Sequence, residues 1–165
     1  MMKCLEIGVG TDRSYKFAPK TPINCTTVFV DIEAPSGNAR KHGMWVVADA
    51  ENLPFPPEFF DRIYASHVIE HLKDPESFLR EAYRVLKKGG FLEVWTPNFL
   101  SINARKDPTH RHVFNVLKLV RLGRKAGFKV YLPNRAGSRL PKPLQRTLSI
   151  AINLFLDELH ITMEK

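Results

Sequence analysis

Two glycines and two aspartates stand at the ends of apolar segments, where they could bind a nucleoside. Gly8-Val9-Gly10 follows the apolar segment Cys4–Ile7, and Asp31 ends the next one. Glycines at such a turn let a ligand approach the backbone closely, and a carboxylate at the second strand end can accept both hydroxyls of a ribose. Asp49 ends a third segment and could accept a hydrogen bond from an exocyclic amine, or cap a turn.

The same glycine loop disfavours a nicotinamide or flavin dinucleotide. The dinucleotide fingerprint needs a third glycine at position 13, where Arg13 stands. The following segment, Ser14–Cys25, contains two prolines and is a poor helix, so the helix N-terminus that binds a pyrophosphate is not expected.

Four histidines are the candidates for a catalytic base, because histidine is the side chain best suited to accept a proton near neutral pH. His67 and His71 follow the fourth predicted strand, and His110 and His112 follow the fifth. His71 could instead cap or pack at a helix start, and Thr109–His112 could be a solvated loop. The pair His110-x-His112 lacks convincing third and fourth ligands, so no metal site is expected.

Short apolar segments must position these residues, and we predict that they are strands alternating with helices. The predicted strands are Cys4–Ile7, Thr26–Val30, Met44–Ala48, Asp61–Ala65, Phe91–Trp95, Phe128–Leu132 and Leu159–Met163. Continuously apolar strands are typical of a mostly parallel sheet with helices on both faces. Ligands bind such sheets beyond the carboxyl ends of the strands, where the polar residues named above would meet.

Three helices are predicted from apolar stripes and terminal signals. The first spans Pro75–Lys88, with Asp74 as its N-cap and Gly89-Gly90 as its stop. The second spans Phe114–Ala126 and has a basic polar side, and the third spans Pro143–Leu156. The apolar stripes of the last two are expected to be core or dimer contacts, with docking on a membrane as an alternative.

The 165 residues, 44% hydrophobic and 25% charged, fit one globular domain over residues 1–165. No apolar run approaches the roughly 20 residues of a membrane-spanning helix, and the N-terminus lacks a signal-peptide pattern. A cytoplasmic protein without an integral membrane segment is therefore expected. Cys4 and Cys25 are expected to be buried thiols on neighbouring strands rather than a redox pair.

The net charge of +8 lies entirely in the second part of the chain. Residues 101–165 hold 13 Lys and Arg against 4 Asp and Glu, whereas residues 1–100 hold 12 against 13. The basic segment could attract phosphates, nucleic acid or anionic headgroups, or could be a solvated surface. It lacks aromatic residues spaced for base stacking, so nucleic acid is weakly supported as a partner.

Several motifs, in this order along residues 4–98, resemble the class I S-adenosylmethionine-dependent methyltransferases, of the small-molecule type with a minimal domain. The motifs are Leu5-Glu6-Ile7-Gly8-Val9-Gly10, Val30-Asp31-Ile32, Asp49-Ala50-Glu51-Asn52-Leu53-Pro54-Phe55, Phe60-Asp61, His67-Val68-Ile69-Glu70-His71-Leu72 and Glu81-Ala82-Tyr83-Arg84-Val85-Leu86-Lys87-Lys88-Gly89-Gly90. The resemblance implies a Rossmann-like sheet of seven strands whose last strand is antiparallel, with S-adenosylmethionine as the cofactor. Residues 1–100 would bind the cofactor, and residues 101–165 would form the substrate side.

The resemblance also implies roles for individual residues. Those for the cofactor are Glu6, Gly8 and Gly10 at the methionine part, Asp31 with Ile32 at the ribose, Asp49 with Ala50 at the adenine, and Ser66 with His67 beside the sulfonium. Two features depart from the family pattern. Asp12 replaces the third glycine, and the helices at the N-terminal end are reduced or missing.

We therefore predict methyl transfer to an oxygen or nitrogen nucleophile of a small, anionic acceptor. The basic segment would select that acceptor, so replacing Arg111 and His112 should reduce turnover more than cofactor binding. The alternative is a non-catalytic methyltransferase-like module that acts as a partner subunit and contacts RNA. A homodimer is a further expectation.

Overall fold

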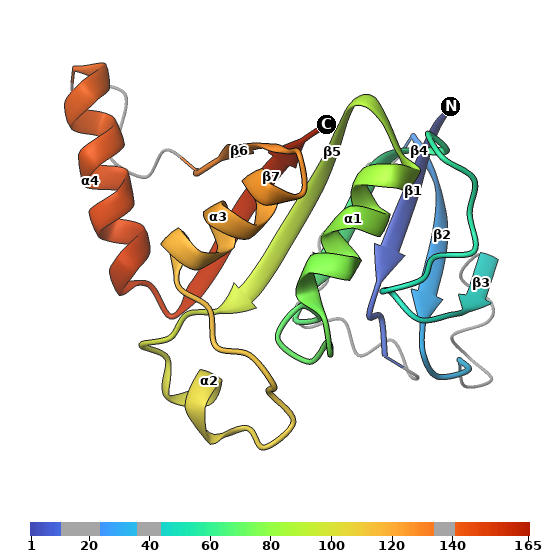
Figure 1. Ribbon diagram of the computed structural model, residues 1–165, viewed down its shortest axis with the longest axis horizontal. Coiled ribbons are helices and arrows are strands. Elements are labelled where there is room, and N and C mark those ends of the chain that lie inside the picture. The colour runs from blue at the N-terminus through green and yellow to red at the C-terminus, as the bar shows by residue number, and fades with distance from the viewer. Residues whose placement is uncertain (11–23, 36–43, 134–140) are drawn as a thin grey trace.

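A seven-stranded sheet runs through the part of the chain that the computed structural model describes, residues 1–10, 24–35, 44–133 and 141–165 (Figure 1). Its strands lie in the order β3-β2-β1-β4-β5-β7-β6, and β1 to β5 are parallel. Strand β7 is antiparallel to both of its neighbours. The strands are β1 (Met2–Ile7), β2 (Cys25–Asp31), β3 (Met44–Val47), β4 (Phe60–Ser66), β5 (Leu86–Pro97), β6 (Lys129–Tyr131) and β7 (Glu158–Glu164).

The seven predicted strands are all present, and the antiparallel last strand is confirmed. Strand β1 is buried on both faces from Cys4 to Ile7, as expected for the centre of a covered sheet. In β5 only alternate residues are buried, among them Leu92 and Val94, because one face of this strand packs on the core and the other is partly exposed. The predicted loop Ser14–Cys25 falls mostly within residues 11–23, outside the described residues, as does Asp12.

Helices flank the sheet, and α1 (Pro75–Val85) lies against it next to α3 (Val116–Lys125) (Figure 1). The Asp74 side chain accepts a hydrogen bond from the backbone of Glu76, and Phe78, Leu79 and Ala82 are buried on one stripe. The predicted end at Lys88 is wrong, because Leu86 already pairs with Phe60 and begins β5. Gly89 and Gly90 therefore lie inside the segment of β5 rather than at the helix end.

Two further helices complete the described part of the chain. The five-residue α2 (Ile102–Lys106) was not predicted, since it is too short to show an apolar period. Helix α4 (Lys142–Phe155) stands at the edge of the sheet beyond α3 (Figure 1). Its Leu144, Leu148 and Phe155 side chains are exposed, so of the two contacts expected for this stripe, core or dimer, they do not make the first.

The prediction of two free thiols is also wrong, because Cys4 and Cys25 form a disulfide between β1 and β2. The two strands are neighbours, and their register pairs Met2 with Cys25, two residues before Cys4. This diagonal position brings the two Cα atoms to 5.9 Å, within the range that a disulfide spans. Among the described residues, no helix has the length and apolarity needed to cross a membrane.

Candidate active site

The carboxyl ends of the parallel strands meet at one edge of the sheet, the lower edge in Figure 1, and a cavity opens there. We call it the inner cavity; its volume is about 320 Å³. It brings together seven residues predicted to bind the cofactor, from β1, β2, β4 and the loop after β3. They are Gly8, Gly10, Asp31, Ile32, Asp49, Ala50 and His67.

Gly8 has to be glycine at this edge. Its φ is +73°, and a Cβ at this position would lie 2.1 Å from Cγ2 of Val68, which lines the same cavity. Both conditions exclude a side chain, since positive φ is strained for other residues and the space is filled. The backbone of β1 is therefore bare where it reaches the cavity.

Asp31 and Asp49 both line the inner cavity from adjacent strand ends. Asp31 accepts hydrogen bonds from the backbone amides of Gly10, at 2.8 Å, and Glu33, at 3.1 Å. Asp49 accepts one from the amide of Glu51 at 2.9 Å. These bonds to the local backbone hold both carboxylates in place beside the cavity.

The loop after Asp49 is held by an ion pair that the sequence analysis did not single out. Arg84 donates to both carboxylate oxygens of Glu81, at 2.8 and 2.7 Å. Glu81 accepts the amide of Leu53, and Arg84 donates to the carbonyls of Leu53 and Phe55. The hydrogen bonds from Arg84 lower the pKa of Glu81. The pair, at positions i and i+3 of α1, thus ties α1 to the loop that follows Asp49.

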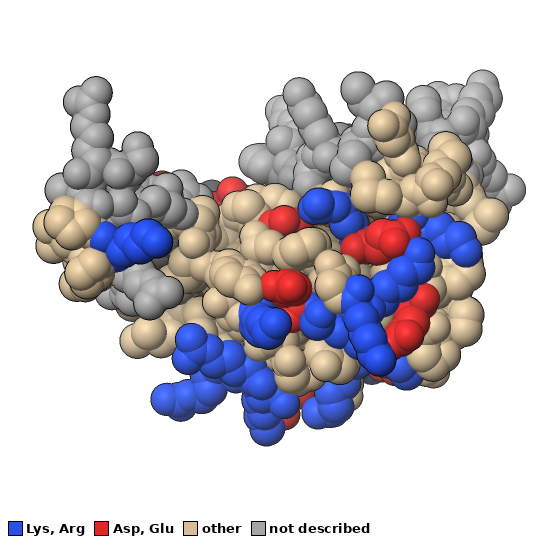
Figure 2. All heavy atoms as spheres, turned by 90° about the horizontal axis from the view of Figure 1, so that it is seen from above, with Lys and Arg blue, Asp and Glu red and all other residues tan. Residues whose placement is uncertain are grey.

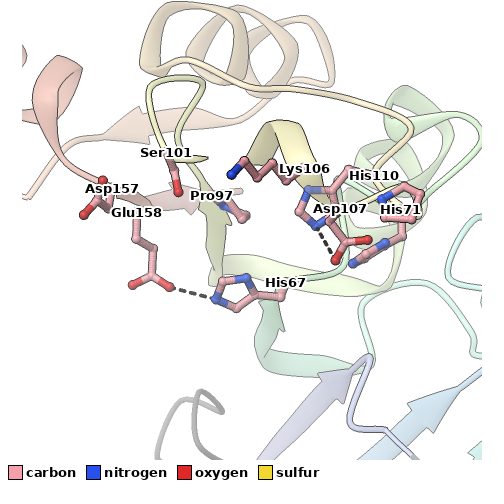
Figure 3. Close-up of a pocket in the computed structure, with 10 residues that line it drawn as sticks. His67, His71, Pro97, Ser101, Lys106, Asp107, His110, Asp157 and Glu158 are labelled. Carbon is pink, nitrogen blue, oxygen red and sulfur yellow. Dashed lines mark hydrogen bonds and ion pairs between the residues drawn. The ribbon is translucent and has the colours of Figure 1, made fainter. Parts of the chain in front are cut away.

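A second and larger cavity of about 900 Å³, which we call the outer cavity, adjoins the first. His67 and His71 line both cavities. Figure 3 shows the outer cavity between the loop after β4, the segment from α2 to His110, and the start of β7. The other lining residues are Pro97, Ser101, Lys106, Asp107, Pro108, His110, Asp157 and Glu158.

His67 is held between two carboxylates. Its Nε2 lies 2.8 Å from Oε1 of Glu158 (Figure 3). Its Nδ1 lies 3.4 Å from Oε1 of Glu70. The hydrogen bond to Glu158, and then the contact with Glu70, raise the pKa of His67 to about 9. His67 is therefore charged at neutral pH and does not suit the role of a base. Its φ of +54° is unusual for a residue with a side chain.

Glu70 is a buried carboxylate that the sequence analysis quoted within a motif but did not propose as a site residue. It is 1% exposed, and its Oε2 accepts a hydrogen bond from Thr96 Oγ1 at 3.0 Å. Its backbone carbonyl accepts the amides of Arg111 and His112, which ties the loop after β4 to the loop after α2. The signal for Glu70 was its place between His67 and His71.

His71 and His110 meet across the outer cavity, with ring centroids 4.8 Å apart. The Nδ1 atom of His71 lies 3.2 Å from the carbonyl oxygen of Thr109, and that of His110 lies 3.2 Å from the carbonyl oxygen of Ala104. A carbonyl only accepts, so each Nδ1 carries a hydrogen, and Nε2 is the atom that holds the lone pair whenever the ring is neutral.

Three other predicted residues do not line either cavity. His112 lies with its Nε2 3.4 Å from the carbonyl oxygen of Lys73. Glu6 is buried in β1, and Ser66 is half-buried at the end of β4. The cavities therefore collect three of the four candidate histidines.

The basic segment, residues 101–165, supplies most of the residues that line the outer cavity but little positive charge. Helix α3 carries four exposed basic side chains, Lys118, Arg121, Arg124 and Lys125. Figure 2 shows Lys and Arg side chains gathered along one side of the molecule, which we call the basic surface. The cavity itself is lined by one lysine, Lys106, and by three carboxylates, those of Asp107, Asp157 and Glu158. Its lining is more acidic than the sequence suggested.

The strand order, the glycine turn at β1 and the carboxylates at the next two strand ends define a class I methyltransferase fold. Residues 5–94 match the family described as "Methyltransferase domain". The chain belongs to this family of S-adenosylmethionine-dependent methyltransferases.

Curated relatives share this part of the chain. A 2-methoxy-6-polyprenyl-1,4-benzoquinol methylase from Caenorhabditis elegans is 31% identical over 132 residues, 72% of this chain and 45% of that protein. A 2-methyl-6-phytyl-1,4-hydroquinone methyltransferase from Arabidopsis thaliana is 35% identical over 96 residues, 54% of this chain and 28% of that protein. The chain thus spans less than half the length of either relative.

Solved structures agree with the fold. A SAM-dependent methyltransferase from Thermotoga maritima superposes with a TM-score of 0.66 at 28% identity, covering 100% of this chain and 83% of the other. One from Archaeoglobus fulgidus gives a TM-score of 0.65 at 20% identity, covering 99% and 86%. The second likeness concerns the fold alone.

Proposed function

We propose that the chain transfers a methyl group from S-adenosylmethionine to an oxygen or nitrogen nucleophile of a small acceptor in the outer cavity. One observation carries the proposal: His67 and His71 line both cavities, so ligands in the two cavities meet at a common wall. Family membership supports the cofactor and favours an enzyme over a non-catalytic module.

The inner cavity fits the nucleoside part of the cofactor. Gly8 has no side chain, so a ligand can approach its backbone closely. The carboxylates of Asp31 and Asp49 line the cavity and can accept hydrogen bonds from hydroxyl and amino groups. Asp31 would hold the ribose and Asp49 the adenine, while Gly8 and Gly10 would contact the methionine part. When bound, S-adenosylmethionine supplies an electrophilic methyl group on its sulfonium.

The chain's own residues mainly position the nucleophile for an in-line displacement. Such positioning can supply about 7–11 kcal/mol of the barrier. Charged His67 links the end of β4 to the start of β7 through Glu158, and so fixes the wall between the cavities. His71 and His110 line the acceptor side of this wall, each with its Nδ1 bonded to a backbone carbonyl.

The relatives and the lining of the outer cavity suggest a hydroxyl-bearing acceptor. The two relatives above are named for a benzoquinol and a hydroquinone, which carry hydroxyl groups on a ring. The three carboxylates of the cavity would repel an anion, whereas Lys106 and the charged His67, which is itself paired with Glu158, would attract one. An uncharged phenol or hydroquinone therefore fits this cavity better than the anionic acceptor that the basic segment suggested.

Two measurements test the proposal. Calorimetric titration with S-adenosylhomocysteine should show saturable binding that is weakened by Asp49→Asn. Glu164→Gln is a matched control, because Glu164 lies at the opposite end of the sheet and accepts a hydrogen bond from Tyr131.

Methyl transfer from labelled S-adenosylmethionine should then be assayed with a hydroquinone, a primary amine and a phosphorylated phenol. Absence of binding at millimolar S-adenosylhomocysteine would contradict the proposal and support the non-catalytic module.

A further inference from the structure

Three side chains that could ligate a metal converge where the loop after β4 meets the loop after α2. The donor atoms of Glu70, His71 and His110 all lie within 4.8 Å of one another. Two histidines and one carboxylate are a donor set that binds divalent first-row metals, with open positions left for other ligands. The sequence analysis missed this set because it looked for partners of the His110-x-His112 pair.

The buried carboxylate of Glu70 points to a cation independently of this convergence. Glu70 is 1% exposed, yet its Oε1 accepts no hydrogen bond among the described residues. The charged ring of His67 approaches Oε1 with its Nδ1, but only to the long distance of 3.4 Å. A contact of 3.4 Å is weaker than the full hydrogen bond that a buried carboxylate oxygen normally accepts, so Oε1 has room for a closer partner such as a cation.

Both histidines are oriented in the way that metal ligands commonly are. Each Nδ1–H donates to a backbone carbonyl, that of Thr109 for His71 and that of Ala104 for His110. Such outer bonds fix the ring and leave Nε2 as the ligand atom. Asp107 Oδ2 lies 3.7 Å from Nε2 of His110 and adds negative charge on the same side.

We infer that Glu70, His71 and His110 form a binding site for one divalent transition-metal ion. Metal bonds of about 2.1 Å place the donor atoms of one site about 3–4 Å apart, so small side-chain shifts complete the coordination. His71 and His110 line the outer cavity, and the open positions of the ion therefore face it.

The role of the ion rests on the proposed function. A hydroxyl of the acceptor would occupy an open position, which lowers the pKa of that hydroxyl and promotes loss of its proton to water before methyl transfer. The ion would also offset the carboxylates of Asp107, Asp157 and Glu158 that line this cavity. The ion would thus add positive charge to that of Lys106 and His67 in this cavity.

The test is a titration of the full, tag-free chain with Co²⁺, in which the visible absorbance of the bound Co²⁺ is measured. We expect saturation at one Co²⁺ per chain, and at least about tenfold weaker binding in His71→Ala and His110→Ala. Glu70→Gln should have the same effect, with circular dichroism confirming that it folds. His112→Ala is the matched control and should bind Co²⁺ as the unaltered chain does, because His112 lines neither cavity.

The outcomes separate this inference from the proposed function. The metal site is overturned if no saturable absorbance develops at millimolar Co²⁺, or if His112→Ala weakens binding as much as the two ligand variants. If Glu70→Gln does not fold, Co²⁺ binding by His71→Ala and His110→Ala tests the metal site. Binding of S-adenosylhomocysteine is measured separately without Co²⁺, so its failure overturns the proposed function and leaves the metal site standing.

Discussion

The backbone amide of Gly10 donates a hydrogen bond of 2.8 Å to Oδ2 of Asp31, and this bond joins the ends of β1 and β2. The two strands are neighbours in the sheet, so the bond closes the turn after β1 against the next strand. The glycine turn and the carboxylate are therefore one unit rather than two separate features of the inner cavity.

Replacing Asp31 with asparagine should weaken binding of S-adenosylhomocysteine by about 10- to 100-fold. A hydrogen bond to a charged group contributes about 1.5–3 kcal/mol, and the variant removes the charge that would receive the ribose hydroxyls. Calorimetry measures the change, with Glu164→Gln as the control. Unchanged affinity in Asp31→Asn would show that the nucleoside lies elsewhere.

Gly8→Ala should lower the free energy of unfolding more than Gly10→Ala does, although both glycines have positive φ. A Cβ on Gly8 would meet Val68 Cγ2 at 2.1 Å, whereas a Cβ on Gly10 would meet no atom within 4 Å. We expect about 1 kcal/mol of destabilisation for Gly10→Ala from the backbone alone. Gly8→Ala should exceed this by about 1–3 kcal/mol of overpacking.

Urea unfolding of the two variants checks this order, and the double variant Gly8→Ala with Val68→Ala isolates the clash. Removing the Val68 side chain should recover part of the loss that Gly8→Ala causes. If the two single variants are equally stable, the close approach of Gly8 and Val68 is not present in solution.

Glu81→Gln should reduce stability at pH 7 by about 1–3 kcal/mol, because it breaks the charged bonds to Arg84. The folded-state pKa of Glu81 is lowered, so its contribution is present above the unfolded value near 4.5 and is lost as the pH falls through the folded value. The difference between Glu81→Gln and the unaltered chain should therefore shrink in acid. Glu76→Gln, which removes an exposed pair with Lys125, should cost less than about 1 kcal/mol.

Variants of Lys106 and Arg111 test whether the acceptor binds in the outer cavity or on the basic surface. Lys106 lines the cavity, whereas Arg111 is exposed outside it. Lys106→Gln should raise the KM for an anionic acceptor and leave the KM for a neutral one unchanged. Arg111→Gln should change neither, contrary to the expectation drawn from sequence. A larger effect of Arg111→Gln would place the acceptor on the basic surface.

The sheet and the inner cavity could be predicted because the carboxyl ends of parallel strands all lie at one edge of a sheet. Gly8, Asp31 and Asp49 each follow an apolar segment, and that local signal suffices to bring them together. The roles assigned to them toward the cofactor stay predictions.

The outer cavity could not be predicted in the same way, because it depends on register and loop conformation. Glu158 reaches His67 because β7 is antiparallel and pairs its first residue with Pro97 at the end of β5. His110 and His112 are two residues apart in the sequence, yet His110 lines the cavity and His112 does not. No periodicity in the sequence encodes that difference.

Because β7 is antiparallel, its first residues lie at the edge of the sheet where the parallel strands end. Residues from opposite ends of the chain therefore line the two cavities. In the proposed function the nucleoside would lie against the ends of β1 to β4, whereas Asp157 and Glu158 would face the acceptor from the start of β7. Exchanging only the C-terminal segment between relatives would therefore alter the choice of acceptor while preserving the methyl donor.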